Sequence, residues 1–304
     1  MLGPADLELI RECGYCTLHE PRTVSMCQGE PFLRDGILRF FDGRKLLVCG
    51  YSLEPASGGM SRSVEALVRH CLASDPVEVL AYCGPEEVAL RRLCPSKFRR
   101  IFFEPATPAH AEMVLDCHEE PKSSRLRQWL RSAQNAAFQV REVPLSTFPL
   151  GVAHLRLIER FFSSRESTPV LLDMAFLLGP LAFMPHVRWF EAYREGALCG
   201  LAAVVDAFRD MDLALFLATD PAAAGASDSL YAAMRDSTRS RRKRYLNLGP
   251  SPSAGHYSFK EKWGAKPLVP SYYYCEWGAG ELALGDYNSW PSRLAQYGFR
   301  PAVT

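Results

Sequence analysis

The chain has 304 residues, of which 48% are hydrophobic, and this length allows about two domains with packed cores. Such a composition excludes a disordered or fibrous protein. Lysine and arginine number 35 against 34 aspartate and glutamate residues, so the net charge of +1 gives no overall attraction to nucleic acids or membranes. Any contact with a nucleic acid must therefore be local.

The longest apolar run covers residues 169–185. It is interrupted by Asp173 and by Gly179-Pro180, and it is shorter than the roughly 20 residues that a membrane-spanning helix needs. The N-terminus has no basic flank followed by an apolar stretch, which is the pattern of a secretory signal. We therefore expect a soluble, cytoplasmic protein.

Ten cysteines are scattered along the chain. Cys13 and Cys16 form a CxxC pair near His19 and Cys27, and these residue types are zinc ligands. A second ligand pair at finger-like spacing is missing, so we expect small apolar core residues here and assign no metal.

Strands and helices alternate in the first half. Residues 36–54 predict two strands around the turn Asp42-Gly43, the strongest short hairpin signal. The further expected elements are a helix around 64–71, a strand at 77–83, a helix near 85–94, a strand at 99–105, an amphipathic helix from 122 and a strand at 138–143. Residues 144–151 read as the junction between two domains.

The second half predicts a longer meander. A helix over 152–163 precedes a hairpin at 188–208 that turns at residues 194–197, and 210–219 form a third strand. A loop then leads into a helix that ends in a basic run, followed by strands at 245–249 and 270–277.

This order of elements resembles the GNAT acyltransferase fold. More closely, it resembles the soluble aminoacyl-transferring domain of bacterial phosphatidylglycerol lysyltransferases, a double GNAT module related to the Fem peptidoglycan-bridge transferases. The matching stretches are PFLRDGILRFFDGRKLLVCGY, RLRQWLRSAQNAAFQVREV, AYREGALCGLAAVVD, GASDSLYAAMRDSTRSRRKRYLNLGPSPSAG and FKEKWGAKP. The resemblance implies an α/β protein of tandem GNAT-like domains, residues 1–145 and a catalytic 146–304, each a mixed, mostly antiparallel sheet flanked by helices.

The resemblance also implies transfer of an acyl group, in that family an aminoacyl group from tRNA, onto an acceptor. Asp212 matches the family's Asp-Leu-x-Arg sequence, but Leu215 stands where the arginine is expected. The membrane-embedded region of the lysyltransferases has no counterpart, which disfavours a lipid acceptor. We expect an amine of a small molecule or peptide, as in tailoring of a natural product.

Two donors and one inactive alternative remain open. In acetyl-CoA enzymes of this fold, a glycine-rich turn at a helix N-terminus meets the pyrophosphate. Here the turn AAAGASDS keeps only Gly225, and Asp228 in the first helical turn would repel a pyrophosphate. This favours aminoacyl-tRNA as co-substrate, without another cofactor, over acyl-CoA. The third alternative is a double GNAT module that binds a ligand or partner without catalysis.

Amide formation needs positioning of an amine and stabilisation of an oxyanion, and no covalent nucleophile. The predicted catalytic residues are Asp212, Asn247, His256 and Lys260, and the predicted substrate-binding residues are Asp228, Gly249, Ser251 and Tyr273. Two basic clusters are candidates for tRNA phosphates, namely Arg125, Arg127 and Arg131, and Arg241, Arg242 and Lys243. Structural roles stay open for several of these residues: a solvent-facing strand position for Asp212, a surface loop for His256, N-terminal helix stabilisation for Asp228, part of the core for Tyr273, and a solvated helix end for the second cluster.

Overall fold

The computed structural model describes residues 2–34, 36–43, 45–53, 78–83, 98–105, 112–133, 138–143, 150–163, 181–182, 184–251, 254–269, 273–279 and 299–301. The helices expected around 64–71 and 85–94, and most of 144–151 and 169–185, lie outside these ranges. The chain divides into two compact units. The first contains Met1–Glu112, Pro250–Tyr257 and Leu268–Thr304, and the second contains Met113–Gly249 and Ser258–Pro267.

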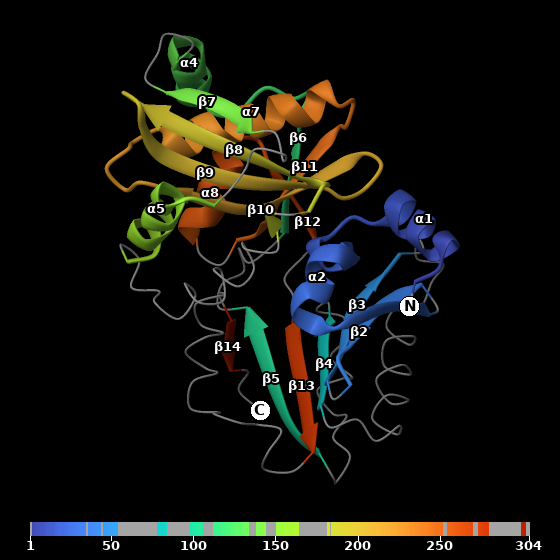
Figure 1. The fold of residues 1–304 in the computed structure, drawn as a ribbon. Coiled ribbons are helices and arrows are strands. Elements are labelled where there is room, and N and C mark those ends of the chain that lie inside the picture. The colour runs from blue at the N-terminus through green and yellow to red at the C-terminus, as the bar shows by residue number, and fades with distance from the viewer. Residues whose placement is uncertain are drawn as a thin grey trace. The chain divides into compact units, whose positions relative to one another are not determined.

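The first unit contains a seven-stranded sheet with the order β1-β2-β3-β4-β13-β5-β14 (Figure 1). Its strands are β1 (Glu30–Arg34), β2 (Ile37–Phe41), β3 (Lys45–Ser52), β4 (Glu78–Cys83), β5 (Phe98–Pro105), β13 (Tyr273–Ala279) and β14 (Phe299–Pro301). Helices α1 (Pro4–Cys13) and α2 (Pro21–Gln28) precede the sheet, with a short 3₁₀ helix at Thr17–His19 between them. The predicted hairpin around Asp42-Gly43 is confirmed, because β2 and β3 pair antiparallel on either side of it.

The second unit contains a sheet with the order β12-β6-β11-β10-β9-β8-β7. Its strands are β6 (Glu112–Asp116), β7 (Gln139–Val143), β8 (Val187–Arg194), β9 (Ala197–Asp206), β10 (Met211–Thr219), β11 (Tyr245–Pro250) and β12 (Lys266–Val269). The helices are α4 (Ser124–Ala133), α5 (Val152–Ser163), α7 (Ala226–Ser240) and α8 (Ala254–Lys262), of which α8 belongs to this unit only from Ser258 on. The predicted hairpin turning at 194–197 and the third strand after it are confirmed as β8, β9 and β10.

The core of the second unit is built around β9. Residues 200–205 of this strand are all buried, because α7 and α5 cover opposite faces of the sheet (Figure 1). Leu230 and Met234 of α7 are fully buried against it, as are Trp189 and Phe190 of the neighbouring β8. Each such side chain contributes on the order of 2 kcal/mol by leaving water, so this packing holds the strands that carry the polar residues described below.

Both sheets are mixed. The register is parallel between β3 and β4 and between β10 and β11, and antiparallel in the other strand pairs whose register the structure gives. The predicted α/β class with mostly antiparallel pairing is thus confirmed. No helix within the described ranges has the length and apolarity required to cross a bilayer.

Candidate active site

The parallel strands β10 and β11 stay paired over only part of their length. The register joins Met211 to Tyr245, Asp212 to Leu246 and Leu213 to Asn247, although β10 continues to Thr219 and β11 to Pro250, all within the described chain. Beyond this point β10 also shifts its register against β9, between Ala214 and Phe216. The two strands therefore part near the end of β11.

Three of the predicted residues meet where the strands part. The backbone N–H of Gly249 donates to Asn247 Oδ1 at 2.8 Å, and the ammonium of Lys260 on α8 donates to the Gly249 carbonyl at 2.8 Å. Asn247 is fully buried and Lys260 is 5% exposed. Gly249 has φ +71°, a conformation that favours glycine, so the chain turns away from the ladder here without strain. The arrangement places a buried positive charge beside a fixed backbone turn.

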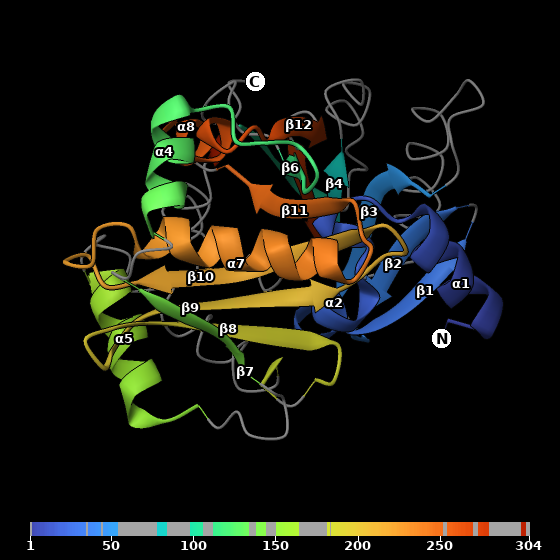
Figure 2. The same cartoon turned by 90° about the horizontal axis from the view of Figure 1, so that it is seen from above.

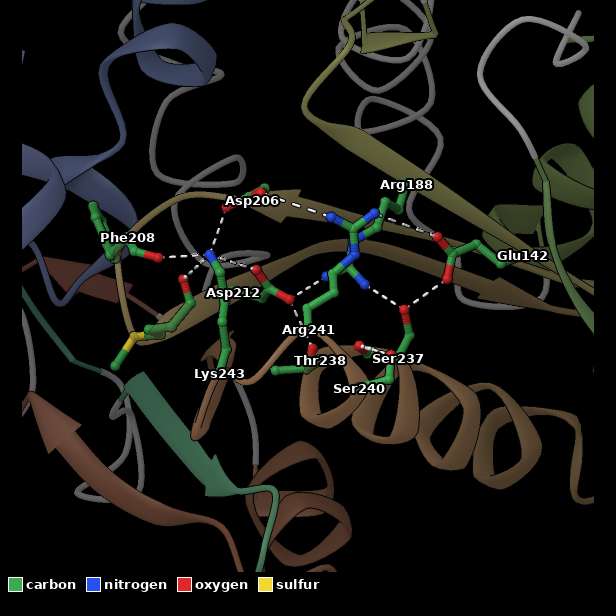
Figure 3. A network of polar contacts seen from close by, with 11 residues as sticks. Glu142, Arg188, Asp206, Phe208, Asp212, Ser237, Thr238, Ser240, Arg241 and Lys243 are labelled. Carbon is green, nitrogen blue, oxygen red and sulfur yellow. Dashed lines mark hydrogen bonds and ion pairs between the residues drawn. The ribbon is translucent and has the colours of Figure 1, made fainter.

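Asp212 lies in a different set of contacts (Figure 3). Its Oδ2 accepts hydrogen bonds from Arg188 of β8 and from Thr238 of α7, the latter at 2.8 Å, and Lys243 Nζ lies 3.0 Å from its Oδ1. The carboxylate is 0% exposed. Buried charges are retained when they are paired and hydrogen-bonded in this way. These contacts favour a structural role for Asp212 at the paired end of β10.

Lys243 is turned inward by the end of α7. Arg242 has φ +64°, and the N–H groups of Arg242 and Lys243 donate to the carbonyls of Arg239 and Thr238, which is the Schellman motif that closes a helix. The Lys243 ammonium is then 2.5 Å from Asp206 Oδ1 and 2.6 Å from the Phe208 carbonyl oxygen. Because Lys243 is only 7% exposed, we remove it from the set of residues proposed to contact phosphates.

Asp228 fastens α7 to α8. Its Oδ1 accepts from the indole N–H of Trp263 at 3.0 Å, and Lys262 Nζ lies 2.8 Å from the same oxygen. Tyr231, one turn further along α7, packs its ring against those of Phe259 and Trp263. These contacts join α7 to α8 and do not cap α7, so both N-terminal helix stabilisation and binding of a substrate amine by Asp228 remain predictions.

The N-terminus of α7 is covered by α4 (Figure 2). Gly225, which caps α7, has φ +93°, and a Cβ atom built on it would lie 2.9 Å from Trp129 Cζ2. Phe138 approaches the same position at 3.4 Å. A methyl group would therefore collide with the indole, so the close approach of Trp129 requires glycine at this position.

The remaining predicted catalytic and substrate-binding residues belong to the first compact unit. Ser251 is fully buried and its hydroxyl finds no hydrogen-bond partner among the described residues, whereas His256 is exposed on α8. Tyr273 begins β13, which pairs with β4 and β5 in the first sheet. Of the site predicted from sequence, the second unit contains Asp212, Asp228, Asn247, Gly249 and Lys260. Their roles in binding or catalysis stay predictions.

Sequence reasoning missed a second buried polar cluster, between α5, β7 and β8. Glu191 accepts from Arg141 Nε and from the Tyr193 hydroxyl, at 2.7 and 2.9 Å, and lies 2.7 Å from His154 Nε2. The N–H of Gly151 donates to His154 Nδ1, so Nε2 carries the proton toward Glu191. The only local signal was a histidine three residues after a glycine at a helix start, which resembles a capping box.

This cluster predicts a loss of stability in acid. Burial alone would raise the pKa of the Glu191 carboxyl, but hydrogen bonds from His154, Arg141 and Tyr193 outweigh it and hold the pKa below its ordinary value. A lowered pKa contributes stability that is present above the unfolded-state pKa of about 4.3 and is lost as the pH falls through the folded-state pKa.

We expect urea unfolding at a series of pH values to show this loss, and Glu191→Gln to flatten the acid limb of the curve. Glu159→Gln, on the exposed side of α5, should leave the limb unchanged. An acid limb equally steep in the Glu191 variant would show that the carboxylate does not contribute.

Several solved structures share the fold of this chain. The C-terminal domain of a putative lysylphosphatidylglycerol synthetase from Agrobacterium fabrum is 13% identical, with a TM-score of 0.55 over 93% of this chain and 96% of that one. L-PGS from Bacillus licheniformis is 14% identical, with a TM-score of 0.54 over 90% and 91% of the two chains. FemX is 11% identical, with a TM-score of 0.58 over 90% and 96%.

The chain shares the fold of these three proteins. The resemblance predicted from the quoted stretches is therefore confirmed at the level of fold. No protein-family model and no curated protein matches the sequence. Identities of 11–14% carry the fold and no more, so the chemistry must be argued from the residues of this chain.

Proposed function

We propose that this protein is an acyltransferase that forms an amide bond beside Gly249, where β10 and β11 part. The observation that carries the proposal is the meeting of Asn247, Gly249 and Lys260 where the paired part of these strands ends. A strand that leaves its ladder exposes backbone to an incoming acyl group, and a fixed positive charge beside it suits a reaction that develops an oxyanion. The shared fold with L-PGS and FemX supports the same class of chemistry.

The proposed step is aminolysis of an ester. An unprotonated amine attacks the ester carbonyl of the donor, the new C–N bond forms, and the C–O bond to the ribose breaks. The proton lost by the amine ends on the departing ribose hydroxyl, so atoms and charge balance. Lys260 stabilises the negative charge that develops on the carbonyl oxygen, while Asn247 fixes the Gly249 turn that orients the acyl group.

Aminoacyl-tRNA is the donor that the contacts around α7 favour. A CoA pyrophosphate would seek the N-terminus of this helix, but Trp129 lies against Gly225 there and Asp228 adds a negative charge in the first turn. An aminoacyl ester on an adenosine terminus needs no such site. The acceptor we propose is an amine of a small molecule or peptide.

The donor is tested by a transfer assay. The purified chain is incubated with radiolabelled aminoacyl-tRNA and a panel of amines, and in parallel with acyl-CoA and the same amines. We expect an amide product that survives mild base, which hydrolyses the ester, only in the tRNA reactions. Amide product formed only in the acyl-CoA reactions would show that acyl-CoA, and not aminoacyl-tRNA, is the donor.

Thermal stability checks the same assignment without turnover. CoA at a hundredfold excess over its dissociation constant would raise the free energy of unfolding by about 2.7 kcal/mol if it bound the folded chain. We expect no such increase up to millimolar CoA. Failure of both donors in transfer and in thermal shift would favour a non-catalytic binding module.

A further inference from the structure

The unpaired stretch of β10 is less buried than the strand beside it. Beyond its last pair with β11, β10 keeps its register with β9 to the end of the strand. On β9, Ala202 and Val204 are fully buried. Their partners on β10, Leu217 and Ala214, are only half-buried, as is Leu215 between them. Because β9 is closed by its own packing, the partial exposure of β10 lies on the side that β11 has left.

This exposed stretch includes a side chain on the face of the sheet that carries α7. Figure 2 shows α7 lying along β10. A Cβ atom built on Gly200 of β9 would lie 2.9 Å from Leu230 Cδ1 of α7, and the partner of Gly200 is Thr219. The Thr219 hydroxyl oxygen lies 3.1 Å from that of Ser227, also on α7. Leu217, two residues before Thr219, therefore points toward the same helix.

The same stretch adjoins the proposed reaction centre. Among the described atoms, only the Ala214 carbonyl oxygen lies within 4 Å of a Cβ atom built on Gly249, at 3.9 Å. The Gly249 carbonyl is the group that accepts from the Lys260 ammonium. We call the half-buried stretch formed by Ala214, Leu215 and Leu217 the β10 opening. A group held at Gly249 would have this opening directly beside it.

The parted stretches of β10 and β11 are uncharged in sequence. Residues 213–219 of β10 and 246–249 of β11 contain no charged side chain. On α7, the acid of the first turn, Asp228, is paired with Lys262 as described above. An apolar group entering the β10 opening would leave water without losing a hydrogen bond, whereas a charged group would have to be desolvated without a partner.

The charges that flank the β10 opening do not suit a charged ligand either. Asp212 and Asp220, which bound the parted stretch in sequence, pair with Arg188 and Arg160 respectively. The Lys260 ammonium at the reaction centre would repel a second cation. An anionic side chain would neutralise the same ammonium, which the proposed reaction needs for the oxyanion.

We infer that the β10 opening binds the side chain of the transferred aminoacyl group, and that this side chain is apolar and uncharged. The inference rests on the proposed function, because it names the class of aminoacyl donor that the parted strands accept. It concerns the side chain only, which is the part of an aminoacyl group that differs between donors. Leu217 is the residue through which the opening selects this side chain.

The test compares two ligands that differ by one charge. Norleucyl-adenosine and lysyl-adenosine, each with an amide in place of the reactive ester, have side chains that differ by the terminal ammonium. Isothermal titration calorimetry measures their binding to the whole chain. We expect the norleucyl ligand to bind at least about tenfold more tightly, because a buried charge without a partner is costly. Equal or tighter binding of the lysyl ligand, or no binding of either, would overturn the inference.

A variant at Leu217 locates the side chain. Leu217→Asp places a carboxylate in the β10 opening, and we expect it to shift the ratio of the two affinities toward the lysyl ligand by about tenfold or more. Leu155→Asp makes the same change on α5, where Leu155 is 52% exposed, and should leave the ratio unchanged. An unchanged ratio in a folded Leu217 variant would overturn the inference. If melting curves show that this variant does not fold, the two ligands on the unaltered chain decide.

Transfer assays separate the inference from the proposed function. If the chain transfers lysine from charged tRNA in preference to leucine, the inference fails and the proposed function stands. If the norleucyl ligand binds selectively and through Leu217, but no charged tRNA gives an amide product, the opening is a binding site for apolar side chains and the proposed function fails.

Discussion

Replacing Asp212 by asparagine is expected to lower the free energy of unfolding by about 3–5 kcal/mol. The side chain is fully buried, and asparagine would leave Arg188 and Lys243 facing each other without their shared anion. Breaking one partner of a buried ion pair is costly because the remaining charges keep their desolvation penalty. Urea unfolding followed by tryptophan fluorescence measures the loss.

A matched variant shows how much of the stability loss comes from the burial of Asp212 and how much from the loss of a carboxylate alone. Asp236→Asn removes an exposed acid of α7 that pairs with Arg239, and we expect a change within about 1 kcal/mol. If Asp212→Asn changes stability as little as this and yet abolishes transfer, the structural role assigned to Asp212 is wrong, and the catalytic role expected from its sequence match returns.

The second large effect concerns Lys260. Lys260→Met removes the buried ammonium beside Gly249 while keeping much of the side-chain volume. We expect the transfer rate kcat to fall by about 10²- to 10³-fold, the range found when one donor to a developing oxyanion is removed. Stability should also fall, by about 1.5–3 kcal/mol, since a hydrogen bond from a charged group is lost.

Lys262→Met is the control for Lys260. Lys262 lies on the same helix, but its ammonium pairs with Asp228 and its side chain is a third exposed. We expect its kcat to stay within about threefold of wild type, because the charge lost here is not beside Gly249 and partly exposed pairs contribute little. A fall in kcat of similar size in both variants would indicate a general effect of α8 on folding, and would remove the argument for Lys260 at the reaction centre.

Local patterns predicted the local elements of this fold. The hairpin of β8 and β9 follows from alternating residues around Glu195-Gly196, and α5 begins and ends where its apolar spacing does. The place of β13 between β4 and β5 did not follow, because pairing with strands about 190 residues earlier leaves no trace in a short window. β6 was also missed, although its run Met113–Leu115 is apolar and buried.

In the candidate site, too, contacts between residues close in sequence could be predicted and contacts between distant residues could not. Asn247, Gly249 and Lys260 were found together because a short strand, a glycine and a helix follow one another closely in sequence. For Asp212 the sequence predicts a catalytic role and gives no sign of the buried ion pair, because its partner Arg188 lies 24 residues away on another strand. Lys243 was read as an exposed cation because it ends a basic run, and the left-handed conformation of Arg242 that turns it inward has no glycine to signal it.

The measurement that tests the central claim most directly is a backbone amide NMR titration. The ligand is an aminoacyl-adenosine in which an amide replaces the reactive ester, so that no transfer occurs. If the parted end of β10 and β11 receives the acyl group, the amide signals of Asn247, Leu248 and Gly249 should shift, while that of Tyr245 at the paired end should not. Saturable binding that leaves the Gly249 signal unmoved would contradict the account.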